Sequence, residues 1–315
     1  MRRILASGLM AAMTLTAQGK EIHGEDVTAP APPGELHGTL FKAGDRSPAV
    51  LIIAGSGPTD RDGNSPLGVR SDMYKMLAEG LAAKGISSLR YDKRGVGESR
   101  SAMTKQSELR VQTYADDAGV MAQALRRQTN TRCVWVLGHS EGALLAELAA
   151  QKPDGICGVI LVSGSGRKIA DVMREQLAVM PEPARGRALA AIAELEAGRL
   201  VSNPPAQPLN LFYTEVQPYL ISWMAENPGQ LLSRIKLPVL ILQGDTDIQV
   251  SVADAKALAA AKPGAKLVIL KGVNHLLKQV PADRAANMAT YADPTLPLAP
   301  GVVDTIAAFV QEPGK

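Results

Sequence analysis

A Gly-x-Ser-x-Gly pentapeptide, GHSEG at residues 138–142, stands between an apolar run and an Ala/Leu-rich run. The apolar residues 134–137 predict a buried strand, and the Ala/Leu-rich run predicts a helix. A pentapeptide on such a strand-to-helix turn is a nucleophile elbow, which holds a serine hydroxyl at the tip of a sheet. Glycines flank the serine because side chains there would clash with the neighbouring strand and helix. The pattern therefore predicts that Ser140 is a nucleophile.

Strand-type and helix-type patterns alternate along most of the chain. Beside the elbow strand, strands are expected at 35–42, 49–54, 86–91, 158–163, 238–243 and 266–270. Helices are expected at 71–84, 111–127, 252–261 and 302–311, and the polar, Pro-rich residues 20–34 are expected to be irregular. This alternation predicts an α/β fold with a doubly wound, mostly parallel sheet. In such a sheet the ligand site lies beyond the carboxyl ends of the strands.

The N-terminus has the pattern of a secretory signal. Two arginines follow Met1, and residues 4–17 are uncharged and mostly apolar but too few to span a bilayer. We expect cleavage after Ala17 or Gly19 and a periplasmic or secreted protein, the alternative being a short N-terminal helix of a cytosolic protein. No cysteine lies near this point and no later stretch is long and apolar enough for a membrane span, so we expect no stable membrane anchor.

The alternation breaks between residues 164 and 236. Residues 167–200 are Ala/Leu/Glu/Arg-rich with helical periodicity, and a helical character resumes at 209–235 after three prolines. We interpret this stretch as a helical cap inserted between two strands of one sheet. The expected organisation is a signal peptide at 1–19, the first part of the core at 20–166, the cap at 167–235 and the second part of the core at 236–315.

Composition narrows the classes of partner. The net charge is only +3 with no basic patch, so a nucleic-acid partner is not expected.

Cys133 and Cys157 each stand at the start of an expected strand. They could form a disulfide in an oxidising compartment, but neighbouring parallel strands rarely offer the required geometry, so we expect two buried thiols. Neither has a Cys-x-x-Cys partner, so no metal site is expected.

A nucleophilic serine needs a base to take its proton and a group to orient that base. Of the four histidines, His23 and His37 lie near the N-terminus, and His139 lies inside the elbow, where the backbone normally aims it away from the hydroxyl. His275 follows the last expected strand and is therefore the candidate base.

The acid is expected between the serine and the histidine in chain order. Asp245 and Asp247 both follow the strand at 238–243, and their spacing does not choose between them. The second aspartate would then be a turn residue.

Five segments together resemble the α/β-hydrolase superfamily: GSGPTDRDG at 55–63, RYDKRGVGES at 90–99, GHSEG at 138–142, LQGDTDIQV at 242–250 and GVNH at 272–275. The resemblance covers nearly all of residues 35–311. More narrowly, the chain is similar to bacterial serine esterases and S33-type aminopeptidase-like hydrolases with a helical cap.

This resemblance implies roles for particular residues. Asp247 is the implied acid of a triad with Ser140 and His275. The implied oxyanion hole consists of the backbone N–H groups of Glu141 and Ser56, with Gly57 as the alternative to Ser56. The usual His-Gly opening of that loop is Ala54-Gly55 here, which keeps the backbone donor.

The implied reaction is hydrolysis of a small-molecule carboxylic ester of short to medium acyl chain through an acyl-enzyme, without cofactor or metal. One alternative is a serine aminopeptidase or amidase, in which Glu194, Glu196 or Glu215 of the cap would bind a free amine. Another is a non-catalytic binding protein on the same scaffold. The complete set of serine, aspartate and histidine argues against this last alternative.

Overall fold

The computed structural model describes residues 23–208 and 211–312, so the predicted signal segment lies outside the described residues. The described strands are β1 Gly24–Ala31, β2 Gly34–Phe41, β3 Ala49–Ile53, β4 Ser87–Tyr91, β5 Val134–His139, β6 Ile156–Val162, β7 Val239–Gly244 and β8 Lys266–Leu270. They form one sheet in the order β1-β2-β4-β3-β5-β6-β7-β8. Strands β3 to β8 are parallel, and β2 is antiparallel to both β1 and β4. The predicted mostly parallel α/β sheet is confirmed.

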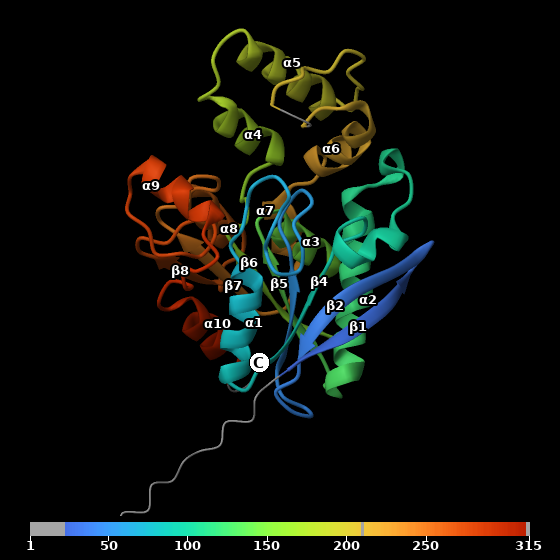
Figure 1. Cartoon of the computed structure of the whole chain (residues 1–315), viewed down its shortest axis with the longest axis vertical. Helices are drawn as coiled ribbons and strands as arrows, with labels where there is room; N and C mark the ends of the chain where they lie inside the picture. The colour runs from blue at the N-terminus through green and yellow to red at the C-terminus, as the bar shows by residue number, and fades with distance from the viewer. Residues whose placement is uncertain (1–22, 209–210, 313–315) are drawn as a thin grey trace, which may run out of the picture.

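Helices cover both faces of this sheet (Figure 1). Their bounds are α1 Met73–Ala83, α2 Val111–Thr129, α3 Glu141–Ala149, α4 Ile169–Leu177, α5 Ala184–Glu196, α6 Gln217–Met224, α7 Pro228–Arg234, α8 Val252–Ala261, α9 Arg284–Ala289 and α10 Val302–Val310, with 3₁₀ turns at Gly97–Ala102, Gln106–Glu108, Thr214–Val216 and Thr290–Ala292. Because side chains alternate along a strand, Leu51 and Ile53 of β3 join the core under α2, α3, α7 and α8. Val50 and Ile52 join the core under α1 and α10.

Helices α4, α5 and α6 lie beyond one end of the sheet, at the top of Figure 1. They share an apolar cluster of their own that includes Ile192, Leu195 and Phe212. Helix α7 differs, because its Leu231 and Leu232 belong to the core of the sheet. Of the stretch expected to form a cap, α4 to α6 therefore make a separate layer and α7 packs on the core.

The expectation of an irregular lead-in at residues 20–34 is wrong for β1. This strand pairs with β2 along its whole length and buries Val27, Ala29 and Ala31 on one face. It is an edge strand, a position in which a proline such as Pro30 is tolerated. Its proline and polar residues hid a period-two pattern of small apolar residues.

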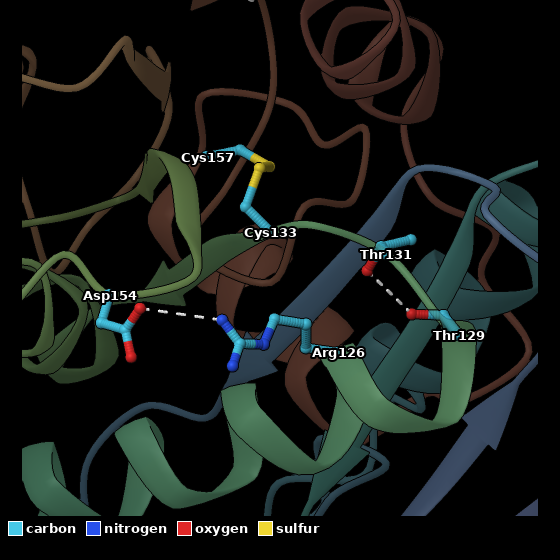
Figure 2. Close-up of a disulfide and its surroundings, with 6 residues drawn as sticks. All are labelled: Arg126, Thr129, Thr131, Cys133, Asp154 and Cys157. Carbon is cyan, nitrogen blue, oxygen red and sulfur yellow. Dashed lines mark hydrogen bonds and ion pairs between the residues drawn. A yellow bond between two sulfur atoms is a disulfide. The ribbon is translucent and has the colours of Figure 1, made fainter.

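The expectation of two free thiols is also wrong, because Cys133 and Cys157 form a disulfide (Figure 2). Their Cα atoms are 5.2 Å apart, at the amino ends of β5 and β6. A register shift explains the geometry: Val134 pairs with Ile156, but Trp135 pairs with Gly158, which leaves Cys157 as the extra residue of a bulge. A regular parallel pair would not bring the two sulfur atoms together.

No helix within the described part of the chain has the length and apolar character needed to cross a membrane.

Candidate active site

Ser140 lies at the turn between β5 and α3, with φ 56° and ψ −120°. A side chain on Gly138 would collide with the Gly142 carbonyl at the start of α3, and one on Gly142 would collide with the Ile53 carbonyl of β3. The two glycines are therefore required by close backbone approach, as the sequence predicted. This packing holds a non-glycine residue in a sparsely populated backbone conformation, which is a feature of functional sites.

His275 and Asp247 are brought together from the loops that follow β8 and β7. His275 Nδ1 lies 2.8 Å from Asp247 Oδ2, and both side chains are buried. Because the carboxylate accepts, Nδ1 carries the proton and Nε2 is the ring nitrogen that can accept one. Asp247 Oδ1 accepts from the backbone N–H groups of Gln249, at 2.8 Å, and Val250, at 3.0 Å.

The environment keeps Asp247 ionised. Burial by itself would raise the pKa of this carboxyl, but the adjacent His275 ring and the hydrogen bonds from His275, Val250 and Gln249 lower it to about 2. Asp245, the other candidate acid, is exposed and accepts instead from the backbone N–H of Gly272 at 2.5 Å. The structure thus places Asp247 beside His275 and Asp245 in a turn contact.

The two predicted oxyanion donors stand close to the elbow. Ser56, Ser140 and Glu141 line one cavity, and a methyl group built on Gly55 would lie 3.3 Å from Ser140 Cβ. Among the hydrogen bonds of the described residues, neither the Ser56 nor the Glu141 backbone N–H has an acceptor. Two free donors beside a serine hydroxyl are the arrangement that stabilises an oxyanion. Gly57, the alternative donor, also lines the cavity.

Comparisons with known proteins show which sequences and folds this chain is similar to. A family model described as "Serine aminopeptidase, S33" matches residues 67–197. The esterase EstD of Thermotoga maritima is 27% identical over 256 residues, which are 80% of this chain and 60% of that esterase. The chain is thus similar in sequence to a serine hydrolase family over residues 67–197 and to an esterase over most of its own length.

Solved structures share the fold of this chain. Est1E from Butyrivibrio proteoclasticus, with ferulic acid bound, is 20% identical with a TM-score of 0.56 and covers 85% of this chain and 96% of its own. The Pyrococcus furiosus esterase Pf2001 is 16% identical with a TM-score of 0.55 and covers 81% of this chain and 84% of its own. At these identities the likeness concerns the fold alone.

The cavity has a volume of about 700 Å³ and is lined by residues of the elbow and of helices α4 and α6. Apolar side chains that the sequence placed in the cap, Leu177, Leu211 and Leu220, line it. Phe212 and Met180 pack instead within the apolar cluster of those helices. The cavity thus combines apolar walls with polar and charged side chains, among them Arg167 and Glu226, and small-molecule sites typically have apolar walls with placed polar groups.

Acidic residues of the cap mostly lie outside this cavity. Glu194 pairs with Arg199, and Glu196 pairs with Arg174. Neither of these glutamates lines the cavity, and Glu215 does not line it either. Glu226, which the sequence did not single out, does line it. Among the described residues, no group of three His, Cys, Asp or Glu side chains is arranged to hold a metal ion.

His139 has a structural role that sequence reasoning missed. Its Nε2 lies 2.8 Å from the His275 carbonyl oxygen, and its Nδ1 lies 2.8 Å from the Tyr74 hydroxyl. The carbonyl can only accept, so Nε2–H donates to it and Tyr74 donates to Nδ1. Burial, followed by the neighbouring His275, lowers the pKa of His139 to about 3 and keeps it neutral. Because Tyr74 also accepts from the Gly55 N–H at 2.9 Å, this chain links the oxyanion loop, the elbow and the loop of the base.

Within the described residues, Ser140 Oγ and the His275 ring share no hydrogen bond. The rings of His139 and His275 are 4.6 Å apart, so the base lies directly beside the elbow. Hydrogen bonds between a nucleophile and its base are often long without substrate and tighten in the complex.

Proposed function

We propose that this α/β-hydrolase is a serine carboxylesterase for esters of short to medium acyl chain, acting through an acyl-enzyme on Ser140. The observation that carries the proposal is the 2.8 Å contact between His275 and Asp247 beside a strained elbow serine. This pair supplies a base whose free nitrogen can accept the serine proton. The sequence relationship to EstD supports an ester as the substrate class.

In the proposed reaction, Ser140 Oγ attacks the ester carbonyl carbon while its proton moves to His275 Nε2. The carbonyl oxygen becomes negative and accepts from the N–H groups of Ser56 and Glu141, each worth roughly 10²–10³ in rate. His275 then gives its proton to the oxygen of the departing alcohol. Water next attacks the acyl carbon and loses a proton to His275, which returns it to Ser140 as the acid leaves. Asp247 stays ionised and holds the imidazole throughout.

The cavity supports the proposed acyl range. Its volume and the apolar side chains from α4 and α6 suit a short or medium acyl chain better than a charged group. Replacing residues 169–224 by a Gly/Ser linker removes α4 to α6 but leaves α7 on the core. We expect the truncated protein to change its chain-length preference on a series of p-nitrophenyl esters. An unchanged preference in a folded truncated protein would show that these helices do not set specificity.

A panel of ester and aminoacyl-amide substrates tests the reaction class. We expect turnover of the esters, and a loss of roughly 10⁴–10⁶ in kcat for Ser140→Ala, as for triad deletions in other enzymes. Ser165→Ala is the matched control, because Ser165 lines the same cavity without a proposed role. Turnover of amides in preference to esters would favour the aminopeptidase reading, with Glu226 as the group that binds the amine. Binding without turnover of either class would favour a non-catalytic protein.

We also propose that the mature protein resides in the periplasm or outside the cell. The Cys133–Cys157 disulfide supports an oxidising compartment, because such bonds are rare in the cytosol. When the protein is expressed with its native N-terminus in a Gram-negative host, mass spectrometry should show that the residues up to Ala17 or Gly19 have been removed. A soluble protein that retains Arg2 would contradict export.

A further inference from the structure

A buried ammonium group, that of Lys93, contacts the oxyanion loop, and Lys93 is among the residues that line the cavity. Lys93 follows β4 and is only 2% exposed. Its Nζ donates to the Gly55 carbonyl at 2.5 Å and to Glu141 Oε2 at 2.8 Å. The same atom lies 5.4 Å from the centre of the Tyr114 ring, within the range of a cation–π contact. Lys93 therefore has a hydrogen-bond partner in the oxyanion loop and another in α3. Burying its charge costs free energy, which suggests that these contacts serve a purpose.

The hydrogen bond to Gly55 fixes the direction of the neighbouring N–H. The Gly55 carbonyl and the Ser56 N–H belong to one peptide group, and they point to opposite sides of a trans peptide. An ammonium on the carbonyl side therefore aims the Ser56 N–H away from Lys93. The positive charge of Lys93 beside the carbonyl oxygen also polarises the peptide group, which makes the Ser56 N–H a stronger donor.

The second oxyanion donor is tied to the same ammonium. Glu141, whose backbone N–H is the other proposed donor, lines the cavity, and its buried side chain pairs with Lys93 through Oε2. Its other oxygen, Oε1, accepts from the Tyr219 hydroxyl of α6 at 2.7 Å. One ion pair thus connects the loop after β3 with the start of α3.

We propose that Lys93 is a positioning residue of the oxyanion hole, which aligns the N–H groups of Ser56 and Glu141 through the Gly55 carbonyl and the Glu141 carboxylate. The inference rests on the proposed esterase reaction. It requires Lys93 to affect the transition state more than the ground state, because the oxyanion forms only as the reaction proceeds. A residue that only stabilised the fold would change the melting temperature and leave kcat unchanged.

The test compares Lys93→Met with Lys278→Met. Lys278 is the control, because it is also buried and its ammonium donates to the Leu296 carbonyl rather than to a group of the oxyanion hole. For each variant, kcat and KM are measured on one ester, together with the affinity for a boronic acid that forms a tetrahedral adduct with the serine. We expect Lys93→Met to lower kcat by about 10- to 100-fold, somewhat less than the loss of a whole donor. KM should change little, and boronate affinity should fall by the same factor as kcat.

Lys93→Met leaves Glu141 as an unpaired buried carboxylate, which can prevent folding. The double variant Lys93→Met/Glu141→Gln removes both charges and keeps an amide that can accept from Tyr219. We expect it to fold and to retain the loss in kcat and boronate affinity. If the folded variant keeps the kcat and boronate affinity of the wild type, Lys93 has no positioning role. If the wild type itself turns over no ester and binds no boronate, the proposed reaction fails instead, and the two failures are thereby distinguished.

Discussion

The two ends of strands β5 and β6 are built in opposite ways. At the carboxyl end, Ser140 has a positive φ, and two backbone donors beside it have no acceptor in the part of the chain that the structure describes. At the amino end, a disulfide joins Cys133 to Cys157 across a bulge. The reactive groups and the covalent cross-link therefore lie at opposite ends of these two strands. The carboxyl end holds a strained serine and backbone donors that are available to a ligand, and the amino end is fixed by a disulfide.

Buried side chains hold the strained end in place. Tyr74 and His139 connect three loops through neutral hydrogen bonds, and Lys93 and Glu141 connect two of them through an ion pair. Strained conformations persist only where the surroundings over-determine them. The carboxyl end therefore depends on directional polar contacts, so its changes should affect activity, whereas changes at the amino end should affect stability.

The largest effect on this comparison is expected from Asp247→Asn. Loss of the orienting carboxylate allows the wrong tautomer of His275 and cost about 10⁴ in kcat in a serine protease. We therefore expect a loss of about 10³–10⁴ in kcat, measured on one ester. Asp245→Asn is the control and should act mainly through stability, because Asp245 contacts the Gly272 N–H rather than the base. A nearly active Asp247→Asn with an inactive Asp245→Asn would reverse the assignment.

A smaller effect, of the opposite kind, is expected from Cys133→Ser/Cys157→Ser. The bridge closes a segment with a sequence separation of 24, and a loop of this size is worth about 3 kcal/mol in the free energy of unfolding. Urea unfolding should show this loss, while kcat at 25 °C should be nearly unchanged. A double variant with the unfolding free energy of the wild type would contradict the account. A double variant whose kcat falls along with its stability would also contradict it, because the amino end would then affect activity.

The smallest effect is expected on α3, the helix that starts at Ser140. Glu147 is buried on it, and its Oε2 has no hydrogen-bond partner among the described residues, so burial raises its pKa well above 4.5. Above pH 4.5 the unfolded chain releases this proton while the folded chain keeps it. Stability should therefore fall as the pH rises towards the folded pKa, by at most about 1.4 kcal/mol per pH unit.

Glu147→Gln replaces the titrating carboxyl by an amide. The free energy of unfolding should then depend less on pH above pH 4.5. The variant should be more stable than the wild type at neutral pH, and the advantage should shrink as the pH falls to 4.5. Urea unfolding at several pH values measures the difference. Parallel profiles for the two proteins would mean that Glu147 is already ionised in the folded chain.

Local patterns predicted much of this molecule, and three-dimensional contacts decided the rest. The helix at 252–261 and the strand at 266–270 were predicted with their observed bounds, because apolar periodicity reflects burial directly. The disulfide was considered but not expected, because it depends on a bulge that a short apolar run does not reveal. Lys93 and His139 were also missed as positioning groups, because their partners lie 38 and 136 residues away in sequence.

Covalent trapping at the elbow tests the central claim most directly. A serine-directed phosphonate should label the protein once, and peptide mass spectrometry should place the adduct on Ser140. Labelling should disappear in Ser140→Ala and should be slowed in Asp247→Asn, because the base then loses its orientation. An adduct on another serine, or full esterase activity in Ser140→Ala, would contradict the account.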